Sequence, residues 1–354
     1  MTPDTSILTP AQATAAVRGA FDATAEALPF NNFLPNQSNP EGLSVSWQPN
    51  TRIEDDEAEF GAFDAEAPYG KEIGTGVTNQ LKLQVIRKRM RITEFGIIQN
   101  SGMSDDWKRD KLTEYFTKLG KEAATRLERA KVEALLTGKI ALDENQVKGV
   151  YDFQRDQSLS VTLAAGKKWS EHKTDPIKDL KGWSDAIDKL DGDRPTVMVT
   201  TKSVLDTLAE DPYVIKYAAI TEADSTRPMI GYQNVQNVLA QYVGITSVLA
   251  VDTMYNEYLR KLGLKFKGGV KSFFEDGNVL LLPGVGGSDL GKTAIGPTAE
   301  AYLDGYEVGG TDRNGFVGVV FPSAGNQPGF DAYMTGTGLP VVTMANNTLA
   351  AKVF

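Results

Sequence analysis

The chain contains no cysteine and a single histidine among its 354 residues. Without cysteine it can form neither disulfides nor thiolate metal sites, so its durability has to come from packing. A histidine base has one candidate, His172, whose charged and polar neighbours are typical of a solvated surface position. We therefore expect no catalytic residue, no metal site and no cofactor.

Long apolar runs and an excess of basic residues are also missing. No stretch approaches about eighteen apolar residues, and no basic segment followed by an apolar run opens the chain, so we expect no membrane partner. The net charge of −9 makes the average surface repel phosphate, which argues against sequence-specific nucleic-acid binding but permits a mildly acidic wall around DNA. With 41% hydrophobic and 23% charged residues, the chain should fold into two or three compact units.

The first fifty residues predict a short helix followed by an extended arm. Thr9 and Pro10 form an N-cap and first-turn signature, and residues 10 to 28 place apolar side chains on one face. Residues 29 to 49 are polar, with scattered apolar side chains that have no core of their own. Ordering such a segment alone costs about 1–2 kcal/mol per residue, so we expect another molecule to bury its rings and those of the following loop. These rings are Phe30, Phe33, Trp47, Phe60, Phe63 and Tyr69.

Charge is sharply segregated in the next forty residues. Residues 52 to 66 hold seven carboxylates and one arginine, whereas residues 82 to 91 hold five cations and no acid. Turn residues lie between the two runs, so residues 51 to 90 predict a long projecting β-hairpin. Charge blocks are usually solvated faces, but limbs of opposite sign can also pair with each other or with a neighbouring molecule. The charged residues that we assign to such a contact are Glu54, Asp55, Asp56, Glu57, Arg87, Lys88 and Arg89.

The clearest helix of the chain spans residues 104 to 137. Ser104 and the acids that follow it suit the positive end of a helix dipole, and Gly138 supplies a C-cap. Apolar positions recur every three or four residues along the whole segment. At about 1.5 Å per residue this helix would extend about 50 Å, which suits the spine of an elongated subunit.

Downstream of this helix, helical and buried-strand patterns alternate. The alternation predicts an α/β domain over residues 171 to 324, and the apolar C-terminal end predicts a final return to a sheet. The expected helices are 176–190, 202–210 and 232–243, and the expected strands are 196–200, 245–251, 279–282 and 315–321.

One motif suggests an enzyme. Residues 286 to 293, GGSDLGKT, satisfy the Walker A pattern after a strand-like VLLLP. A phosphate-binding loop needs a helix that starts at the Lys292 and Thr293 pair, and Gly296 with Pro297 would cut such a helix short. A P-loop nucleotide hydrolase is therefore the weaker alternative, because a glycine-rich turn after a strand explains the motif.

The order of these parts resembles a tailed-phage major capsid protein of the Hong Kong 97 fold. That α+β fold has an N-terminal arm, an extended β-hairpin loop, a spine helix, a peripheral domain and an α/β axial domain. Within it, the chain is most similar to the lambda-like coat protein E family. The matching segments are FNNFLPNQ, APYGKEIGTG, KLQVIRKRMRITEFG and TGTGLPVVTMANNTLAAKVF. By this resemblance the arm is 1–50, the loop 51–90, the peripheral domain 91–170 with 325–354, and the axial domain 171–324.

The resemblance implies a structural protein that self-assembles into the icosahedral head shell around the phage genome. Its implied partners are further copies of itself, in hexamers and pentamers, a portal, in some members a cement protein, and packaged double-stranded DNA in non-specific contact. Because only about fifty residues precede the loop, it also implies a separate scaffolding protein. The implied location is the virion, with assembly in the host cytoplasm. An encapsulin-type nanocompartment shell on the same fold is the alternative.

Overall fold

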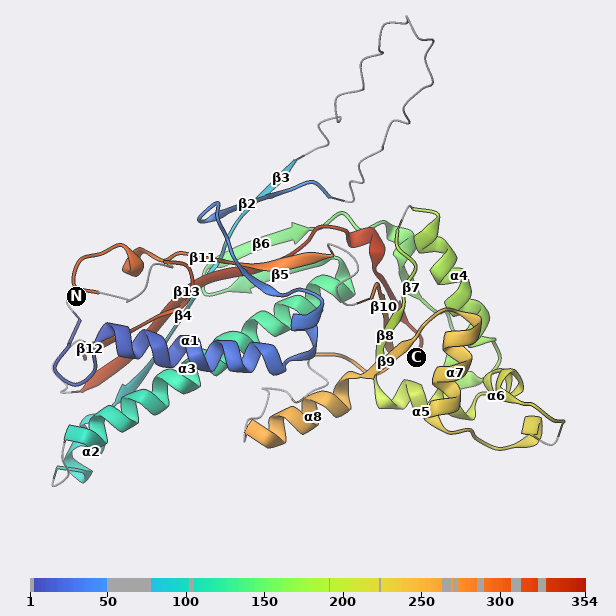
Figure 1. Ribbon diagram of the computed structural model, residues 1–354, viewed down its shortest axis with the longest axis horizontal. Coiled ribbons are helices and arrows are strands. Elements are labelled where there is room, and N and C mark those ends of the chain that lie inside the picture. The colour runs from blue at the N-terminus through green and yellow to red at the C-terminus, as the bar shows by residue number, and fades with distance from the viewer. Residues whose placement is uncertain are drawn as a thin grey trace, which may run out of the picture.

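The computed structural model describes residues 3–49, 78–101, 105–190, 192–222, 224–262, 269, 273–284, 290–306, 313–323 and 329–354. Within these residues the backbone forms two five-stranded sheets and two smaller two-stranded sheets. Figure 1 shows an elongated molecule. The long helices α1 (Pro10–Ala27) and α3 (Asp105–Thr137) lie along one large sheet, and shorter helices surround the other. We call the first the spine sheet and the second the α/β sheet.

The spine sheet combines segments from the whole length of the chain. Its long central strand β13 (Phe330–Val342) pairs antiparallel with β4 (Val85–Ile92), β11 (Gly291–Gly296) and β12 (Val317–Pro322). The short strand β1 (Asn36–Ser38) adds parallel to β11. Segments that lie 250 residues apart in sequence therefore share one sheet.

Helix α1 belongs to the body of the molecule and covers the spine sheet together with α3. The Thr9 side chain accepts a hydrogen bond from the Gln12 amide, and the Gln12 side chain accepts one from the Thr9 amide, so a capping box starts the helix. Its apolar face packs on α3 and on β12, where Val17 and Phe21 are buried. This face is the amphipathic stripe that the sequence predicts.

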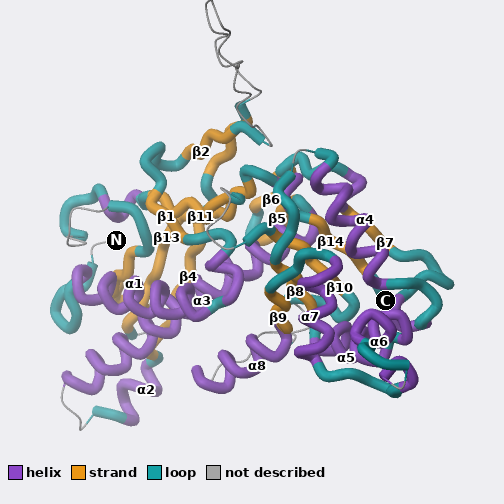
Figure 2. The backbone as a smooth tube through the Cα atoms, turned by 45° about the vertical axis from the view of Figure 1, so that its right-hand side comes forward, coloured by secondary structure: helices purple, strands orange, loops and turns teal. Residues whose placement is uncertain are grey.

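The α/β sheet has the strand order β7-β14-β10-β8-β9 and is mixed, with parallel pairing at both ends and antiparallel pairing in the middle. Its strands are β7 (Ser160–Thr162), β14 (Leu349–Lys352), β10 (Asn278–Leu282), β8 (Val197–Thr200) and β9 (Ser247–Ala250). The helices around it are α4 (Pro176–Asp188), α5 (Lys202–Glu210), α6 (Pro212–Ala218) and α7 (Tyr232–Tyr242). The tube in Figure 2 shows these helices gathered at one end of the molecule, around the C-terminus.

Helix α8 (Val251–Leu262) leaves β9 without an intervening loop and extends from the α/β part toward α3. Three shorter features complete the described chain. Strand β2 (Ser44–Trp47) pairs antiparallel with β3 (Asn79–Lys82), β5 (Lys139–Glu144) pairs with β6 (Val147–Asp152), and α2 (Glu94–Gln99) precedes α3.

Most of the expected elements are present with shifts of a few residues. Helix α3 starts and ends within one residue of the predicted span, and α4, α5, α7, β8 and β10 lie where the patterns place them. The strand expected over 245–251 is shorter, because Val251 begins α8. Helices α6 and α8 are not anticipated by the sequence patterns.

Each of the two large sheets contains strands from both expected domains, and the domain boundaries themselves stay a prediction. Strands β11 and β12 fall inside the range expected for the axial domain, yet they belong to the spine sheet with β13. Strand β14 falls inside the range expected for the peripheral domain, yet it belongs to the α/β sheet. Strand β4 forms part of the spine sheet, although residues 85–90 were expected in the projecting loop. The chain crosses between the sheets several times, and strand patterns do not reveal which sheet a strand joins.

Candidate functional site

The residues predicted to contact a neighbouring molecule fall into two groups. Seven of them lie outside the described residues, so their prediction stays a prediction: Glu54, Asp55, Asp56, Glu57, Phe60, Phe63 and Tyr69. The other six lie in the arm and in β4, and the structure places each of them.

The expectation that another molecule has to bury the rings of the arm is wrong for Phe30 and Phe33. Phe30 is 1% exposed and Phe33 is 6% exposed within the chain itself. Both side chains belong to the apolar core that also contains side chains of α3 and of both large sheets. Residues near the arm in sequence cannot cover these rings, but segments that are distant in sequence do. This burial removes the reason for assigning the two rings to a subunit contact.

Trp47 is also held by its own chain, although less completely. It is half-buried at the end of β2, and its ring centroid lies 6.2 Å from that of Phe153. The β2–β3 ladder begins with Trp47 opposite Asn79, so the base of the segment 50–77 is a paired two-stranded ribbon. This ribbon fixes the positions of the two described residues that flank the segment 50–77.

The basic tract is divided between the two faces of β4, because successive side chains of a strand point in opposite directions. Arg91 donates hydrogen bonds of 2.7 and 3.1 Å to Asp331, and Arg89 lies 3.8 Å from the same carboxylate. The hydrogen bond from Arg91 holds the pKa of Asp331 below its ordinary value. Lys88 points the other way and pairs with Glu122 on α3 at 2.8 Å. Arg87, Lys88 and Arg89 therefore do not form one surface.

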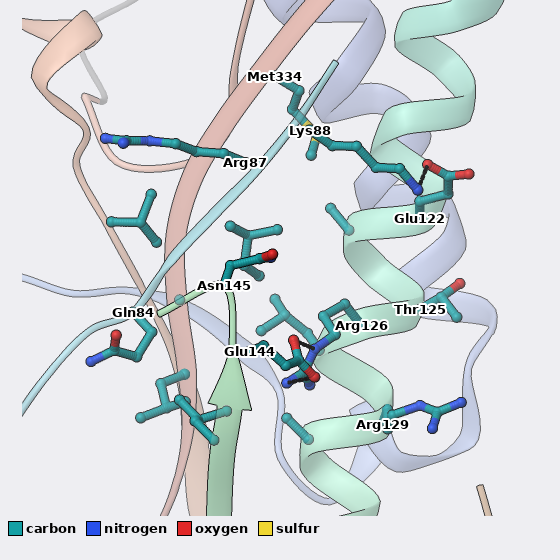
Figure 3. Close-up of a pocket in the computed structure, with 18 of the residues that line it drawn as sticks. Gln84, Arg87, Lys88, Glu122, Thr125, Arg126, Arg129, Glu144, Asn145 and Met334 are labelled. Carbon is teal, nitrogen blue, oxygen red and sulfur yellow. Dashed lines mark hydrogen bonds and ion pairs between the residues drawn. The ribbon is translucent and has the colours of Figure 1, made fainter. Parts of the chain in front are cut away.

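A groove of about 1310 Å³ lies between β4 and α3 and is closed at one end by the β5–β6 hairpin. Figure 3 shows α3 on one side and β4 on the other, with Lys88 reaching toward Glu122 on α3 and Arg87 pointing away from that helix. The cations that line it are Arg87, Lys88, Lys118, Lys121, Arg126 and Arg129. Two carboxylates, Glu122 and Glu144, line it with them.

The two carboxylates neutralise only part of this positive charge. Glu122 pairs with Lys88 at 2.8 Å, and Glu144 pairs with Arg126 at 3.2 Å. Three of the remaining cations, Arg87, Lys118 and Lys121, form no ion pair with a described residue. The groove is therefore a positively charged surface on a chain whose net charge is −9.

Sequence reasoning missed the four cations that α3 contributes to this groove. Lys118, Lys121, Arg126 and Arg129 recur at intervals of three to five residues, which places them along one side of a helix. That periodic charge was available in the sequence.

The Walker A alternative is wrong in the part of the motif that the structure describes. Gly291, Lys292 and Thr293 lie in strand β11, hydrogen-bonded to β13 on one side and to β1 on the other. The Thr293 hydroxyl is fully buried and donates to the carbonyl oxygen of Leu34 at 3.0 Å. A phosphate-binding loop needs this pair at the start of a helix with its amides free.

The remaining candidate for chemistry from the sequence is the single histidine. His172 is less exposed than predicted: its Nδ1 lies 3.2 Å from Oδ2 of Asp211, a fully buried carboxylate that also caps α6. Among the described residues, no cluster of three or more His, Asp or Glu side chains could hold a metal ion. No helix in this part of the chain is both long enough and apolar enough to cross a bilayer.

The sequence of residues 89–301 matches the family described as phage major capsid protein E. The chain belongs to this family. No curated protein matches the chain in sequence. As a member of the family, the chain is a structural shell protein of the virion that assembles with copies of itself, and the predicted family is confirmed.

Solved structures agree with this family assignment. A protein described as a prophage capsid protein of Escherichia coli CFT073 is 16% identical, with a TM-score of 0.59 over 98% of this chain and 99% of its own. A phage-related protein from Bordetella bronchiseptica RB50 is 12% identical, with a TM-score of 0.54 over 96% of this chain and 95% of its own. At such identities the likeness establishes the fold alone, and it confirms the predicted Hong Kong 97-type capsid fold.

Proposed function

We propose that this capsid protein forms the hexamers and pentamers of an icosahedral phage head, and that neighbouring copies are joined through the acidic segment 52–66. The observation that carries the second part is charge complementarity. The acidic segment contains seven carboxylates and one arginine. The groove between β4 and α3 is lined by six cations and two carboxylates. We assign the groove of one copy as the receptor for the acidic segment of another.

Such a contact suits assembly because its electrostatic part sets register and partner choice more than affinity. Each contact is individually modest, and a closed shell gains durability from their number. A separate scaffolding protein, a portal, a cement protein and packaged DNA are further partners of such a head. The family match favours a phage head over an encapsulin-type compartment.

Removal of residues 51–77 tests the role of the segment. Trp47 and Asn79 are opposite each other in the β2–β3 ladder, so a short glycine–serine turn can close the gap without disturbing the body. We expect a soluble chain with unchanged helix content by circular dichroism and no closed particles by negative-stain electron microscopy. Closed particles of normal size would contradict this part of the proposal.

Charge reversal tests the groove directly. We expect Lys118→Glu with Lys121→Glu to lower both the yield of closed particles and the binding of a synthetic peptide of residues 51–66. Raising the ionic strength should also weaken peptide binding to the unaltered chain, because exposed pairing is screened within about 10 Å at 0.1 M salt. The measurements are particle yield by sedimentation and peptide binding by fluorescence anisotropy.

The matched control reverses two exposed lysines outside the groove, Lys181→Glu with Lys189→Glu, which changes the net charge equally. This control should assemble and bind the peptide like the unaltered chain. If both double variants behave alike, net charge rather than the groove governs assembly. If the groove variant binds the peptide with unchanged affinity at every salt concentration, the groove is not the receptor.

A further inference from the structure

The core where the two large sheets meet contains an ionisable pair. Glu128 and Lys131 lie one turn apart on α3 and are 1% and 2% exposed. Lys131 is the only lysine that the described part of the chain buries. The apolar side chains of this core come from both large sheets, among them Leu339 of β13 and Leu282 of β10. The assembly function proposed above makes no use of this pair.

The pair holds two other elements against the spine helix. Oε1 of Glu128 accepts a hydrogen bond of 3.1 Å from the amide of Phe30 and one of 2.9 Å from the hydroxyl of Tyr255. Nζ of Lys131 donates to Oδ1 of Asn31 at 2.8 Å. One turn of α3 therefore binds both the short 3₁₀ turn Pro29–Asn32 and helix α8.

Helix α8 connects this contact on α3 to the α/β sheet. It starts at Val251, directly after β9 of the α/β sheet, and reaches α3 through Tyr255. Figures 1 and 2 both show it extending away from the α/β part. A second bond, from the hydroxyl of Tyr258 to the carbonyl oxygen of Thr24, ties it to the end of α1 at 3.4 Å. How firmly α8 is held therefore affects how the two sheets are joined.

The titratable groups that face Glu128 are Lys131 on its own helix and Tyr255 and Tyr258 on α8. The turn 29–32 presents only neutral groups, the Phe30 amide and the Asn31 side chain. Burial raises the pKa of Glu128, and burial lowers the pKa of Lys131 to about 8, although each charge partly offsets the shift of the other. Burial raises the pKa of Tyr255 well above its ordinary value, so this hydroxyl remains a donor.

We propose that Glu128 and Lys131 form a proton-responsive joint, in which the protonation of the pair sets how firmly α8 and the turn Pro29–Asn32 are held against the spine helix. Removing two charges from water costs free energy that their attraction recovers only in part. The joint is therefore least firm when both groups are ionised. It becomes firmer when either group is neutral.

The sign of the pH dependence follows from the two shifts. A carboxyl with a raised pKa binds its proton more tightly in the folded chain, so Glu128 favours the fold at low pH and this contribution is lost as the pH rises through its folded pKa. Lys131 binds its proton less tightly in the folded chain, so its contribution to folding improves as the pH rises from about 8 toward 10.5. Helix α8 and the turn Pro29–Asn32 should be held least firmly at pH values between the folded pKa of Glu128 and that of Lys131.

The test compares the unassembled full-length chain with the double variant Glu128→Gln with Lys131→Met. The glutamine oxygen can still accept the bonds from Phe30 and Tyr255, so the substitution removes charge and keeps those two hydrogen bonds. We expect α8 amide hydrogens to exchange about tenfold more slowly in the variant at pH 7, which corresponds to about 1.4 kcal/mol. The advantage should narrow toward low pH, where Glu128 becomes protonated, and again above pH 8. Comparing both chains at the same pH cancels the intrinsic exchange chemistry.

Two controls make the result specific. The exposed pair Lys111 and Glu114 has the same residue types and spacing on the same helix, so Lys111→Met with Glu114→Gln should change α8 exchange at no pH. Helix α4 packs in the α/β part away from the pair, and its exchange should be equal in all chains. In the unaltered chain alone, the protection of α8 relative to α4 should pass through a minimum between the two pKa values.

Three results would overturn the joint. The first is a ratio of α8 exchange rates between variant and unaltered chain that is the same at every pH. The second is a pair of single substitutions whose effects on α8 exchange sum to that of the double variant. The third is an unaltered chain whose α8 protection shows no minimum with pH. None of these measurements requires particles. The joint and the assembly proposal can therefore fail independently.

Discussion

At the scale of single residues, Gly120 decides how closely the two long helices approach. A β-carbon at this position would lie 2.4 Å from the carbonyl oxygen of Val17 and 3.1 Å from the β-carbon of Ala20, both on α1. The first distance is shorter than β-carbons adopt and the second is unusually tight, so α3 presents bare backbone where α1 crosses it. The glycine weakens α3 locally and permits α1 to pack closely against α3 on the spine sheet.

Gly120→Ala should therefore destabilise the chain although alanine is the better helix former. We expect an overpacking loss of about 1–3 kcal/mol, measured as the free energy of unfolding in urea. Gly19→Ala is the matched control, because Gly19 lies on α1 with no atom within 4 Å of its β-carbon position. That control should gain about 0.5–1 kcal/mol from helix propensity. A stabilised Gly120→Ala variant would show that the helices can separate without loss.

At the scale of elements, the C-terminal end of α3 is held by a residue eighteen positions beyond it. Gly138 takes a positive φ of 70° after the last helical residue, and Arg155 covers it. The Arg155 guanidinium donates bonds of 2.7 Å to the carbonyl oxygens of Leu135 and Leu136. These carbonyls have no partner within the helix, and a cation there also favours the helix dipole. Burial lowers the pKa of Arg155 to about 10.

The substitution Arg155→Met should destabilise the C-terminal end of α3. Two carbonyl oxygens at the helix end lose a charged donor, so we expect a loss of about 2–4 kcal/mol in the free energy of unfolding. The control is Arg194→Met, which breaks exposed pairs with Asp185 and Asp188 and should cost less than about 1 kcal/mol. Thermal unfolding followed by circular dichroism measures both. Equal losses in the two variants would mean that the Arg155 bonds add nothing beyond a surface pair.

The sequence predicts whether most segments form helices or strands, but it does not predict which strands pair. The apolar period of α3 and the glycine after it predict both its length and its end. Strand β11 is an exception: glycine and lysine at its start have low strand propensity, so its first residues predict a turn. Pairing with β13 and β1 makes it a strand. Only a folded chain supplies those partners.

At the scale of the whole molecule, the charge segregation was visible in the sequence but the surface that completes it was not. The acidic segment is continuous, so composition alone reveals it. The basic groove is assembled from β4 and from one side of α3, with two carboxylates that neutralise part of its charge. Lys88 points into it toward Glu122, whereas Arg87 and Arg89 extend to the opposite face of β4, where Arg89 lies near Asp331. The strand period decides which residue goes to which face.

The predicted N-terminal helix is an integral layer of the body, and a truncation tests its contribution to stability. Deleting residues 1–28 would remove the buried side chains Ile7, Leu8, Val17 and Phe21 and uncover the faces of α3 and β12 beneath them. Each large buried side chain contributes about 1.5–3 kcal/mol, and whole domains are stable by only about 5–15 kcal/mol. We therefore expect an insoluble chain, or one without cooperative thermal unfolding. By contrast, deletion of 51–77 should leave cooperative unfolding intact. A truncated chain that unfolds cooperatively would show that α1 is dispensable.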